Sequence, residues 1–406
     1  MSAVRTYLDY NATAPLRAEA REAMLAAMDA GGNPSSVHAE GRRARAIVEK
    51  AREQVAALVG AEPRDVVFTS GATETANQVL RRAWGTVLFS RIEHPCVVAP
   101  ALQSEGRIED LHVGADGRID PVALAVKLEA MSAAGHLPQG RSLLAVQMAN
   151  NETGVLQPLG EIAAVAREHG VAMLCDAVQA AGRLAIDFAT SGVDYMMISS
   201  HKIGGPKGVG ALIAKGGGDI PPLVIGGGQE NRRRAGTENV EGIAGFGAAA
   251  EAALRDLASM ERIGAWRDRI EQEARAVRPD TAVVGSTAPR LANTSSLAVP
   301  GLASETLVIR LDLAGYAVSA GSACASGKVG SSPVLAAMGV APDIARAAVR
   351  ISLGHATTAD DIDRFIETWC GIVSVSRNSS VTLPRASAPA AQHHEAAIAA
   401  AAMGER

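Results

Sequence analysis

Short apolar segments alternate with longer amphipathic segments between residues 66 and 214, and this alternation constrains the fold more than any other feature of the chain. The apolar segments have the length of buried strands and lie at 66–69, 87–89, 143–147, 171–175, 194–198 and 209–214. Amphipathic segments such as 74–83 and 159–168 have the period of helices. Because alternating strands and helices are typical of parallel pairing, the sequence predicts an α/β domain with a mostly parallel central sheet.

The pattern changes near residue 239, where helical periodicity begins and continues almost without a break to about residue 277. Strand and helix patterns follow at 281–284, 294–298, 304–313, 349–352 and 360–373. They predict a smaller α+β domain that a long helix joins to the first. The expected boundaries are 15–255 for the large domain, 1–14 with 256–375 for the small domain, and 376–406 for a low-complexity tail.

Composition excludes several classes of function. The net charge of −4 gives no basic field for nucleic acid, and aromatic residues are only 3% of the chain, so smaller apolar residues must fill the core. We find no apolar run of membrane length and no signal-peptide pattern at the N-terminus. The four cysteines have neither metal-ligand spacing nor a disulfide framework. We therefore expect a cytoplasmic protein that binds no metal, membrane or nucleic acid.

Lys202 lies in a glycine-rich segment, 199–208, between two predicted core strands. A tight loop held by core strands is a rigid platform for a lysine that must reach a fixed point. The alternative is a surface turn with an ordinary solvated lysine.

Other polar residues follow the predicted strands, at the edge of a parallel sheet where ligands gather. The segment 69–74 leads into a helix whose free N–H groups, with the Thr73 hydroxyl, suit a phosphate; a plain N-cap role for Thr73 is the alternative. Asp176 needs a buried partner, which is either a protonated ring nitrogen of a cofactor or a structural arginine. His94 and the segment 150–154 also follow strands. The alternatives are a core histidine with its hydrogen bonds satisfied and an Asx-type turn.

A lysine, an aspartate, a phosphate-binding loop, a histidine and an asparagine are together the groups that hold pyridoxal 5'-phosphate. The lysine forms an imine with this cofactor, and the aspartate keeps its pyridine nitrogen protonated.

Cys324 lies in a second reactive segment, 319–332, in which almost every residue is small or polar. A cysteine there has no packing role, unlike Cys175 and Cys370 in apolar patterns, and this favours a reactive thiol. Cys96, beside Pro95, is interpreted as structural. Arg350 is suited to bind a substrate carboxylate, and an ordinary ion pair is the alternative.

Motifs from about residue 7 to residue 373 are similar, in unbroken order, to those of the cysteine desulfurases that serve iron–sulfur cluster assembly and nitrogenase maturation. The matching segments are 7–13, 32–35, 69–74, 150–154, 176–179, 200–208, 234–237, 321–324 and 350–354. The resemblance implies a fold-type-I pyridoxal-phosphate enzyme with a seven-stranded type of sheet, working as a homodimer. It also implies that L-cysteine is converted to L-alanine, with the sulfur held on an enzyme cysteine as a persulfide for a sulfur acceptor or iron–sulfur scaffold protein.

The resemblance assigns roles residue by residue. Lys202 would bind the cofactor, Cys324 would attack the substrate sulfur, and His94 would stack on the ring and relay protons. Asp176 would pair with the ring nitrogen and Gln179 with the phenolic oxygen. The cofactor-binding residues would be Ala72, Thr73, Asn151, Asp176, Gln179, Ser199, Ser200 and His201, with Thr237 of the partner subunit. L-Cysteine would be bound by Asn33, Asn151 and Arg350.

Three features depart from the family pattern. Ser200 stands where many relatives have glycine, and we expect this difference to be tolerated. An Ala-rich tail replaces the polar segment that usually follows the final helix, so docking to a scaffold protein is left open. The loop after Cys324 has its own sequence, so acceptor preference is not carried over. The rival functions are those of another fold-type-I enzyme, either an aminotransferase or a selenocysteine lyase, and of a non-catalytic sulfur carrier or scaffold.

Overall fold

The computed structural model describes residues 5–218, 220–321 and 332–375. Its largest element is a seven-stranded sheet in the order β2-β8-β7-β6-β5-β3-β4. The strands are β2 (Val66–Thr69), β3 (Thr86–Ser90), β4 (Arg107–Leu111), β5 (Ser142–Gln147), β6 (Ala172–Asp176), β7 (Tyr195–Ser199) and β8 (Gly210–Ala214). Only β8 is antiparallel to its neighbours, which confirms the predicted α/β fold with a mostly parallel sheet.

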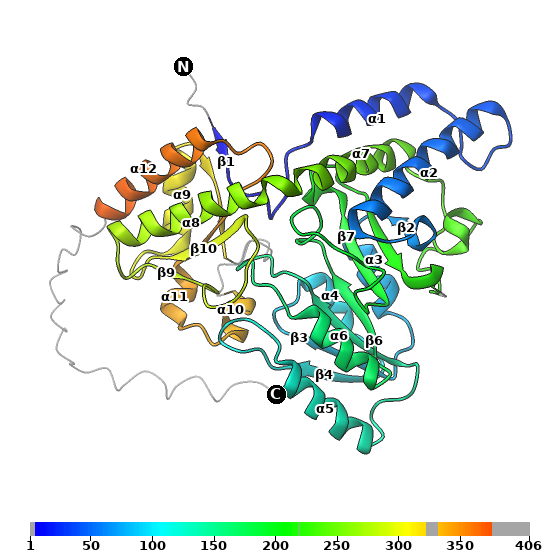
Figure 1. Cartoon of the computed structure of the whole chain (residues 1–406), viewed down its shortest axis with the longest axis horizontal. Helices are drawn as coiled ribbons and strands as arrows, with labels where there is room; N and C mark the ends of the chain where they lie inside the picture. The colour runs from blue at the N-terminus through cyan, green and yellow to red at the C-terminus, as the bar shows by residue number, and fades with distance from the viewer. Residues whose placement is uncertain (1–4, 219, 322–331, 376–406) are drawn as a thin grey trace, which may run out of the picture.

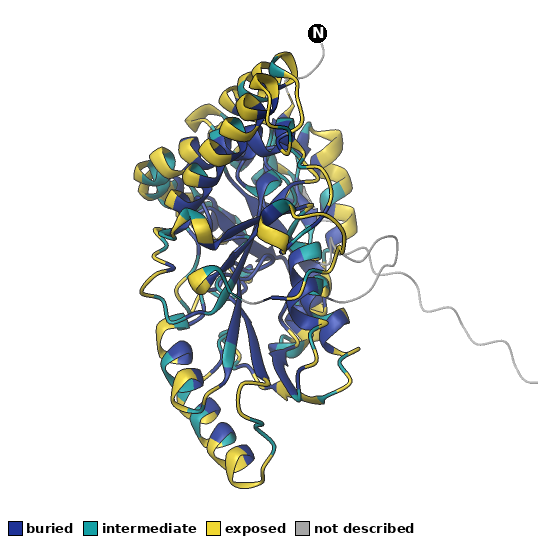
Figure 2. Ribbon diagram, turned by 90° about the vertical axis from the view of Figure 1, so that its right-hand side faces the viewer, coloured by how far each residue is buried: buried dark blue, intermediate teal, exposed yellow. Residues whose placement is uncertain are grey.

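Helices cover both faces of this sheet, because alternate residues of each strand point to opposite sides. In β6, Met173 and Cys175 join one core and Leu174 joins the other. The first face is covered by α1 (Ala18–Ala30), α2 (Ala39–Val59), α5 (Pro121–Ala133), α6 (Leu159–Glu168) and α7 (Val240–Asp256). The second is covered by α3 (Ala72–Leu80) and α4 (Pro95–Ala101). In Figure 2 most strands are dark blue and the helices turn yellow sides outward, so the sheet forms the centre of the core.

A second sheet has four strands in the order β12-β13-β10-β9. Its strands are β9 (Ala282–Val283), β10 (Thr294–Ala298), β12 (Ser319–Ala320) and β13 (Ala348–Ser352), all in antiparallel pairs. The helices of this region are α8 (Met260–Val277), α9 (Ser304–Leu313), α10 (Pro333–Ala337), α11 (Pro342–Ala347) and α12 (Ala359–Val375). Its core contains the buried side chains of Phe365 and Trp369.

The two regions are connected at two places. Helices α7 and α8 follow one another across the molecule, separated by one short turn at Leu257–Ser259 (Figure 1). The start of the chain also reaches the second region, because β1 (Thr6–Tyr7) pairs in parallel with β11 (Tyr316–Ala317). The domain boundaries given above stay predictions, and the tail 376–406 lies outside the described residues. Within the described ranges, no helix combines the length and the apolar character needed to cross a membrane.

The register of the large sheet brings several strand ends to one edge. Gln147 lies opposite Asp176, which lies opposite Met197. At the other side of the edge, Gly210 lies between Thr69 and Ser199. Side chains that immediately follow β2, β5, β6 and β7 therefore meet in one place.

Candidate active site

A cavity of about 540 Å³ opens at this edge of the large sheet, a volume within the range of small-molecule and cofactor sites. The structure brings most of the predicted site residues to its wall. They are Ala72, Thr73, His94, Asn151, Asp176, Gln179, Ser199, His201, Lys202 and Arg350. Residues separated by more than 270 positions in the sequence thus share one cavity.

Lys202 ends a short 3₁₀ turn, Ser200–Lys202, directly after β7. Its Nζ donates hydrogen bonds to the carbonyl oxygens of Asn11 (2.6 Å) and Ala12 (2.9 Å). The amine is therefore held at the cavity wall by backbone groups from the N-terminal segment, instead of extending into solvent as an ordinary surface lysine does.

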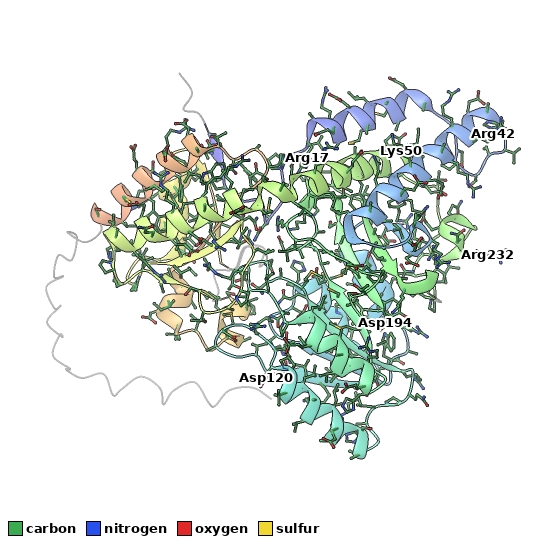
Figure 3. All side chains as sticks on the ribbon, viewed as in Figure 1. Arg17, Arg42, Lys50, Asp120, Asp194 and Arg232 are labelled. Carbon is green, nitrogen blue, oxygen red and sulfur yellow. The ribbon has the colours of Figure 1, made fainter. Side chains whose placement is uncertain are left out.

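The loop after Lys202 is fixed by close packing. Arg17, labelled in Figure 3 beside the start of α1, donates through Nε to the carbonyl oxygen of Ile203 at 2.8 Å. Its Nη1 also forms an ion pair with Asp256 at 2.6 Å. Gly204 has φ +86°, and a Cβ atom there would lie 2.7 Å from the Arg17 side chain. Only glycine allows this approach without strain, so the glycine-rich sequence specifies the rigid platform.

Asp176, the last residue of β6, presents its carboxyl group to the cavity. Oδ1 accepts a hydrogen bond from the Val178 N–H at 2.9 Å. Burial raises the pKa of Asp176 to about 6, although the Val178 hydrogen bond and the charge of Lys202 oppose the rise. Among the described residues, no ion pair includes Asp176, so the alternative of a structural arginine partner finds no support. A buried carboxylate in this position suits a cationic ring nitrogen.

The N-terminus of α3 forms the end of the cavity that suits an anion. Gly71 is its N-cap, so Thr73 is the second helical residue and not the plain N-cap considered from sequence. A Cβ atom on Gly210 would lie 2.6 Å from the Gly71 Cα, and glycine at 210 therefore lets this turn lie against the sheet. The Ala72 and Thr73 backbone N–H groups are at the positive end of the helix dipole.

Charged and polar neighbours support the same reading of this end of the cavity. His201 and Lys207 line the cavity as well, and the His201 Nδ1 lies 3.1 Å from the Thr13 hydroxyl. Glu74 is paired with Arg234, whose Nε lies 3.0 Å from its Oε1. Burial alone would raise the pKa of Glu74, but the hydrogen bonds from Arg234 and Ser70 lower it below its usual value. Glu74, the acidic residue in the first turn of α3, therefore stays ionised, and the charge of Arg234 balances it. A phosphate fits the donors that remain.

His94 is the N-cap of α4, and its Nδ1 accepts a hydrogen bond from the Cys96 N–H at 3.2 Å. This contact places the ring proton of the neutral imidazole on Nε2. Burial and, to a lesser extent, the charge of Lys202 lower the pKa of His94 to about 4. A neutral ring on the cavity wall is suited to stack on an aromatic ligand.

His94 is expected to stay neutral down to about pH 5 in the cofactor-free protein, since its pKa lies below the ordinary value of about 6.5. A histidine NMR titration of the folded protein measures this directly. The same titration in denaturant is the control, because the unfolded chain removes the burial that disfavours the charged ring. A folded-state midpoint near 6.5 for His94 would contradict the assignment.

Arg350, in β13, connects the second sheet to the cavity. Its Nη2 forms an ion pair with Asp9 at 2.8 Å, and Nη1 donates to the Asn151 carbonyl oxygen at 2.9 Å. The side chain is buried, and among the described residues its Nε has no hydrogen-bond partner. The ion pair considered from sequence therefore exists, yet one N–H donor remains for a substrate carboxylate.

The segment 150–154 contains the Asx-type turn that was the alternative interpretation. Asn150 Oδ1 accepts from the backbone N–H groups of Glu152 and Thr153, both at 2.9 Å. This turn leaves Asn151 on the cavity wall. The structural role of Asn150 and the predicted role of Asn151 thus fall on neighbouring residues.

Three predicted site residues that the structure describes do not line the cavity, and a fourth is not described. Ser200 is fully buried behind the lysine loop, and Asn33 lies in the turn between α1 and α2, where its side chain accepts from the Ser35 N–H. Thr237 is exposed beside a separate hollow near Arg234. Cys324 lies outside the described residues. The roles of these residues stay predictions.

The described residues that flank Cys324 in sequence nevertheless lie near the cavity. Ser332 donates a hydrogen bond to Glu152 Oε2 at 2.5 Å, and Gly321 lies next to the same carboxylate. Glu152 adjoins Asn151 in the chain. Burial raises the pKa of Glu152 to about 7, against the opposing effects of Ser332 and Arg350.

Sequence reasoning missed other groups at the site. The carbonyl oxygens of Asn11 and Ala12 hold the amine of Lys202, but backbone oxygens leave no signal in residue identity. Lys207 also lines the cavity, and no role of its own was predicted for it from sequence. Arg183 was also missed, because its burial depends on tertiary contacts that residue identity does not reveal.

Comparison with known proteins places this architecture among characterised relatives. The family model described as Aminotransferase class-V matches residues 6–365. The chain is 37% identical to cysteine desulfurase IscS of Dictyoglomus turgidum, covering 92% of this chain and 96% of the relative. It is 40% identical to a cysteine desulfurase of Cereibacter sphaeroides, covering 92% and 97%. The solved structure of a NifS-like protein from Rickettsia africae superposes with a TM-score of 0.83 at 33% identity, covering 91% of this chain and 99% of that one.

Proposed function

Because this chain belongs to the class-V aminotransferase family and, within it, to the cysteine desulfurases, we propose that it converts L-cysteine to L-alanine and holds the released sulfur on Cys324 as a persulfide. The observation that carries the proposal is the meeting of Lys202, Asp176 and the α3 N-terminus in one cavity. The alternatives are an aminotransferase, a selenocysteine lyase and a non-catalytic carrier. They are less well supported, because the relatives of this chain are named cysteine desulfurases.

The donors in the cavity fit pyridoxal 5'-phosphate. An amine, a buried carboxyl group and a helix N-terminus match its aldehyde, its ring nitrogen and its phosphate. In this proposal Lys202 binds the aldehyde carbon, Asp176 holds a proton on the ring nitrogen, and His94 stacks on the ring. Ala72, Thr73, Ser199 and His201 hold the phosphate, and Gln179 donates to the phenolic oxygen.

When bound, this cofactor supplies an electron sink for the substrate carbon next to the amino group. The chain's own residues do the rest. Arg350 and Asn151 hold the substrate, with the carboxylate on Arg350. The thiolate of Cys324 attacks the substrate sulfur, so a sulfur–sulfur bond forms as the carbon–sulfur bond breaks. The carbon gains a proton and leaves in alanine, and one cysteine plus one thiol yields one alanine plus one persulfide.

We also propose that the enzyme is a homodimer in which Thr237 of the partner subunit completes the phosphate site. Two observations support this. Thr237 is exposed in the single chain, and the nearby Leu223, Val224 and Ile225 expose apolar side chains that a second subunit is suited to cover.

We also propose that the persulfide sulfur is delivered to an iron–sulfur scaffold or another acceptor protein, since one relative is the cysteine desulfurase IscS. A cytoplasmic location stays a prediction.

Incubation of the cofactor-loaded protein with L-cysteine and a thiol reductant is expected to release alanine and sulfide in equal amounts. Quantifying both products, together with pyruvate, measures the reaction class. Alanine without sulfide, or pyruvate formed from added alanine, would contradict a desulfurase. A colourless protein that does not take up pyridoxal phosphate would instead support a non-catalytic carrier.

A further inference from the structure

Arg183 is a buried cation in the wall behind the cavity, and the roles assigned above do not use it. It is 7% exposed, and among the described residues no ion pair includes it. Every hydrogen bond that Arg183 donates within the described residues goes to an uncharged oxygen atom. Nη1 donates to the Gln179 carbonyl oxygen at 2.9 Å and to Gln179 Oε1, while Nη2 donates to the carbonyl oxygens of Tyr10 (3.2 Å) and Lys202 (3.5 Å).

A buried charge without an opposite charge is unfavourable for folding. Burial and the nearby charge of Arg350 lower the pKa of Arg183 to about 9, which still leaves it charged at neutral pH. An uncharged polar residue would avoid this cost. The contacts of Arg183 connect the lysine loop, the N-terminal segment and Gln179. Arg183 is therefore suited to position these groups.

The contact with Gln179 determines which way that amide faces. A guanidinium group only donates hydrogen bonds, so the amide oxygen must face Arg183 and the amide nitrogen must face away. The amide nitrogen, Nε2, donates to the Asn11 carbonyl oxygen at 3.0 Å. The same oxygen accepts from Lys202 Nζ at 2.6 Å. Gln179 therefore presents an N–H donor on the side where the amine of Lys202 lies.

We propose that Arg183 is a positioning residue that fixes the Gln179 amide with its nitrogen toward the phenolic oxygen of the cofactor. We also propose that its charge disfavours a proton on the Lys202 nitrogen that is linked to the cofactor. This inference rests on the proposed function. If the amide were free to turn, its oxygen would face the negatively charged phenolic oxygen for part of the time. The buried charge has a second effect, because a cation beside the linkage disfavours a proton on the Lys202 nitrogen.

The test compares two replacements of Arg183 in the loaded enzyme. R183M removes the charge and all donors at similar length, and R183K keeps the charge but loses the forked geometry. The measurement is the visible absorption of the bound cofactor as a function of pH, with kcat and KM for L-cysteine. For R183M we expect the midpoint of the absorption change to rise by about one pH unit and kcat to fall about tenfold. For R183K we expect a midpoint near the wild-type value and a smaller loss of kcat.

A double-mutant cycle with Gln179 separates positioning from a purely structural role. In a Q179L background, R183K is expected to lower kcat much less than in the wild type, because the amide that it positions is absent. R267M is the matched control, since Arg267 on α8 likewise donates to a backbone carbonyl, that of Leu291 at 2.7 Å, outside the cavity wall. We expect R267M to leave the absorption midpoint unchanged.

The outcomes are distinguishable. Losses of kcat that add without coupling, with an unchanged absorption midpoint, would overturn the inference and leave Arg183 as a structural residue. If R183M does not fold, the cycle with R183K and Q179L decides the question alone. Failure of the wild-type protein to develop the visible band or to release alanine would contradict the proposed function instead. The thermal unfolding of each cofactor-free variant reports stability separately from both readouts.

Discussion

Lys202→Ala is expected to lower the rate of alanine release from L-cysteine by at least about 10⁴-fold. It is also expected to remove the visible absorption of covalently bound cofactor. The physical reason is that the amine of Lys202 is the group that the structure holds at a fixed point of the cavity wall. Its Nζ is held by two backbone carbonyl oxygens, and its loop is braced by Arg17. Absorption spectroscopy with added pyridoxal phosphate and an alanine assay measure the two effects together.

Lys207→Ala is the control for this prediction. Lys207 belongs to the same loop and also lines the cavity, but its side chain is exposed. We expect the variant to bind the cofactor more weakly and to keep its visible band. A Lys202→Ala protein that still forms the band would show that another amine binds the cofactor.

Cys324→Ser is expected to lower alanine release by at least about 10³-fold while the visible band remains, since a hydroxyl group is a far weaker nucleophile toward sulfur than a thiolate. Cys324 lies outside the described residues, so this prediction rests on the sequence and on the family of the chain. The described flanking residues Gly321 and Ser332 both approach Glu152, which adjoins Asn151 on the cavity wall. The measurements are alanine release and detection of the persulfide by alkylation and mass spectrometry.

The other cysteines supply the controls for this variant. Cys370, on α12, is outside the cavity wall, and Cys370→Ser is expected to retain activity. Cys96 was interpreted from sequence as structural, yet it lines the cavity. Burial raises the pKa of Cys96, and the negative charges of Asp176 and Glu93 raise it further, so it stays a thiol. Normal turnover of Cys324→Ser combined with loss in Cys96→Ser would reassign the nucleophile.

Much of the site could be predicted from local sequence because of one property of parallel sheets. Asp176 ends a strand and Thr73 and Lys202 follow one, and strand ends in such a sheet share one edge. Their residue types then indicate phosphate, ring nitrogen and aldehyde. The prediction therefore needed only the strand pattern and the side-chain chemistry.

Other parts of the site could not be predicted because they depend on contacts between distant segments. The parallel pair β1–β11 brings the N-terminal segment to the second sheet, and the hydrogen bonds of Asn11 and Ala12 then bring it to Lys202. Local pattern does not encode either contact. Arg350 illustrates the same limit. Its sequence position suggested either an ion pair or a carboxylate site, and the fold supplies an Asp9 partner together with an Nε that has no hydrogen-bond partner among the described residues.

The order of strands and helices, the glycine-rich lysine loop and the residue types of the proposed reacting groups were determined by the sequence, because each depends on periodicity or on the chemistry of single side chains. The tertiary structure alone decided which backbone oxygens hold the amine of Lys202, which way the Gln179 amide faces and where the charge of Arg183 is buried. These features depend on donors and acceptors that come from separate segments. Only the folded chain brings such groups within hydrogen-bond distance of one another.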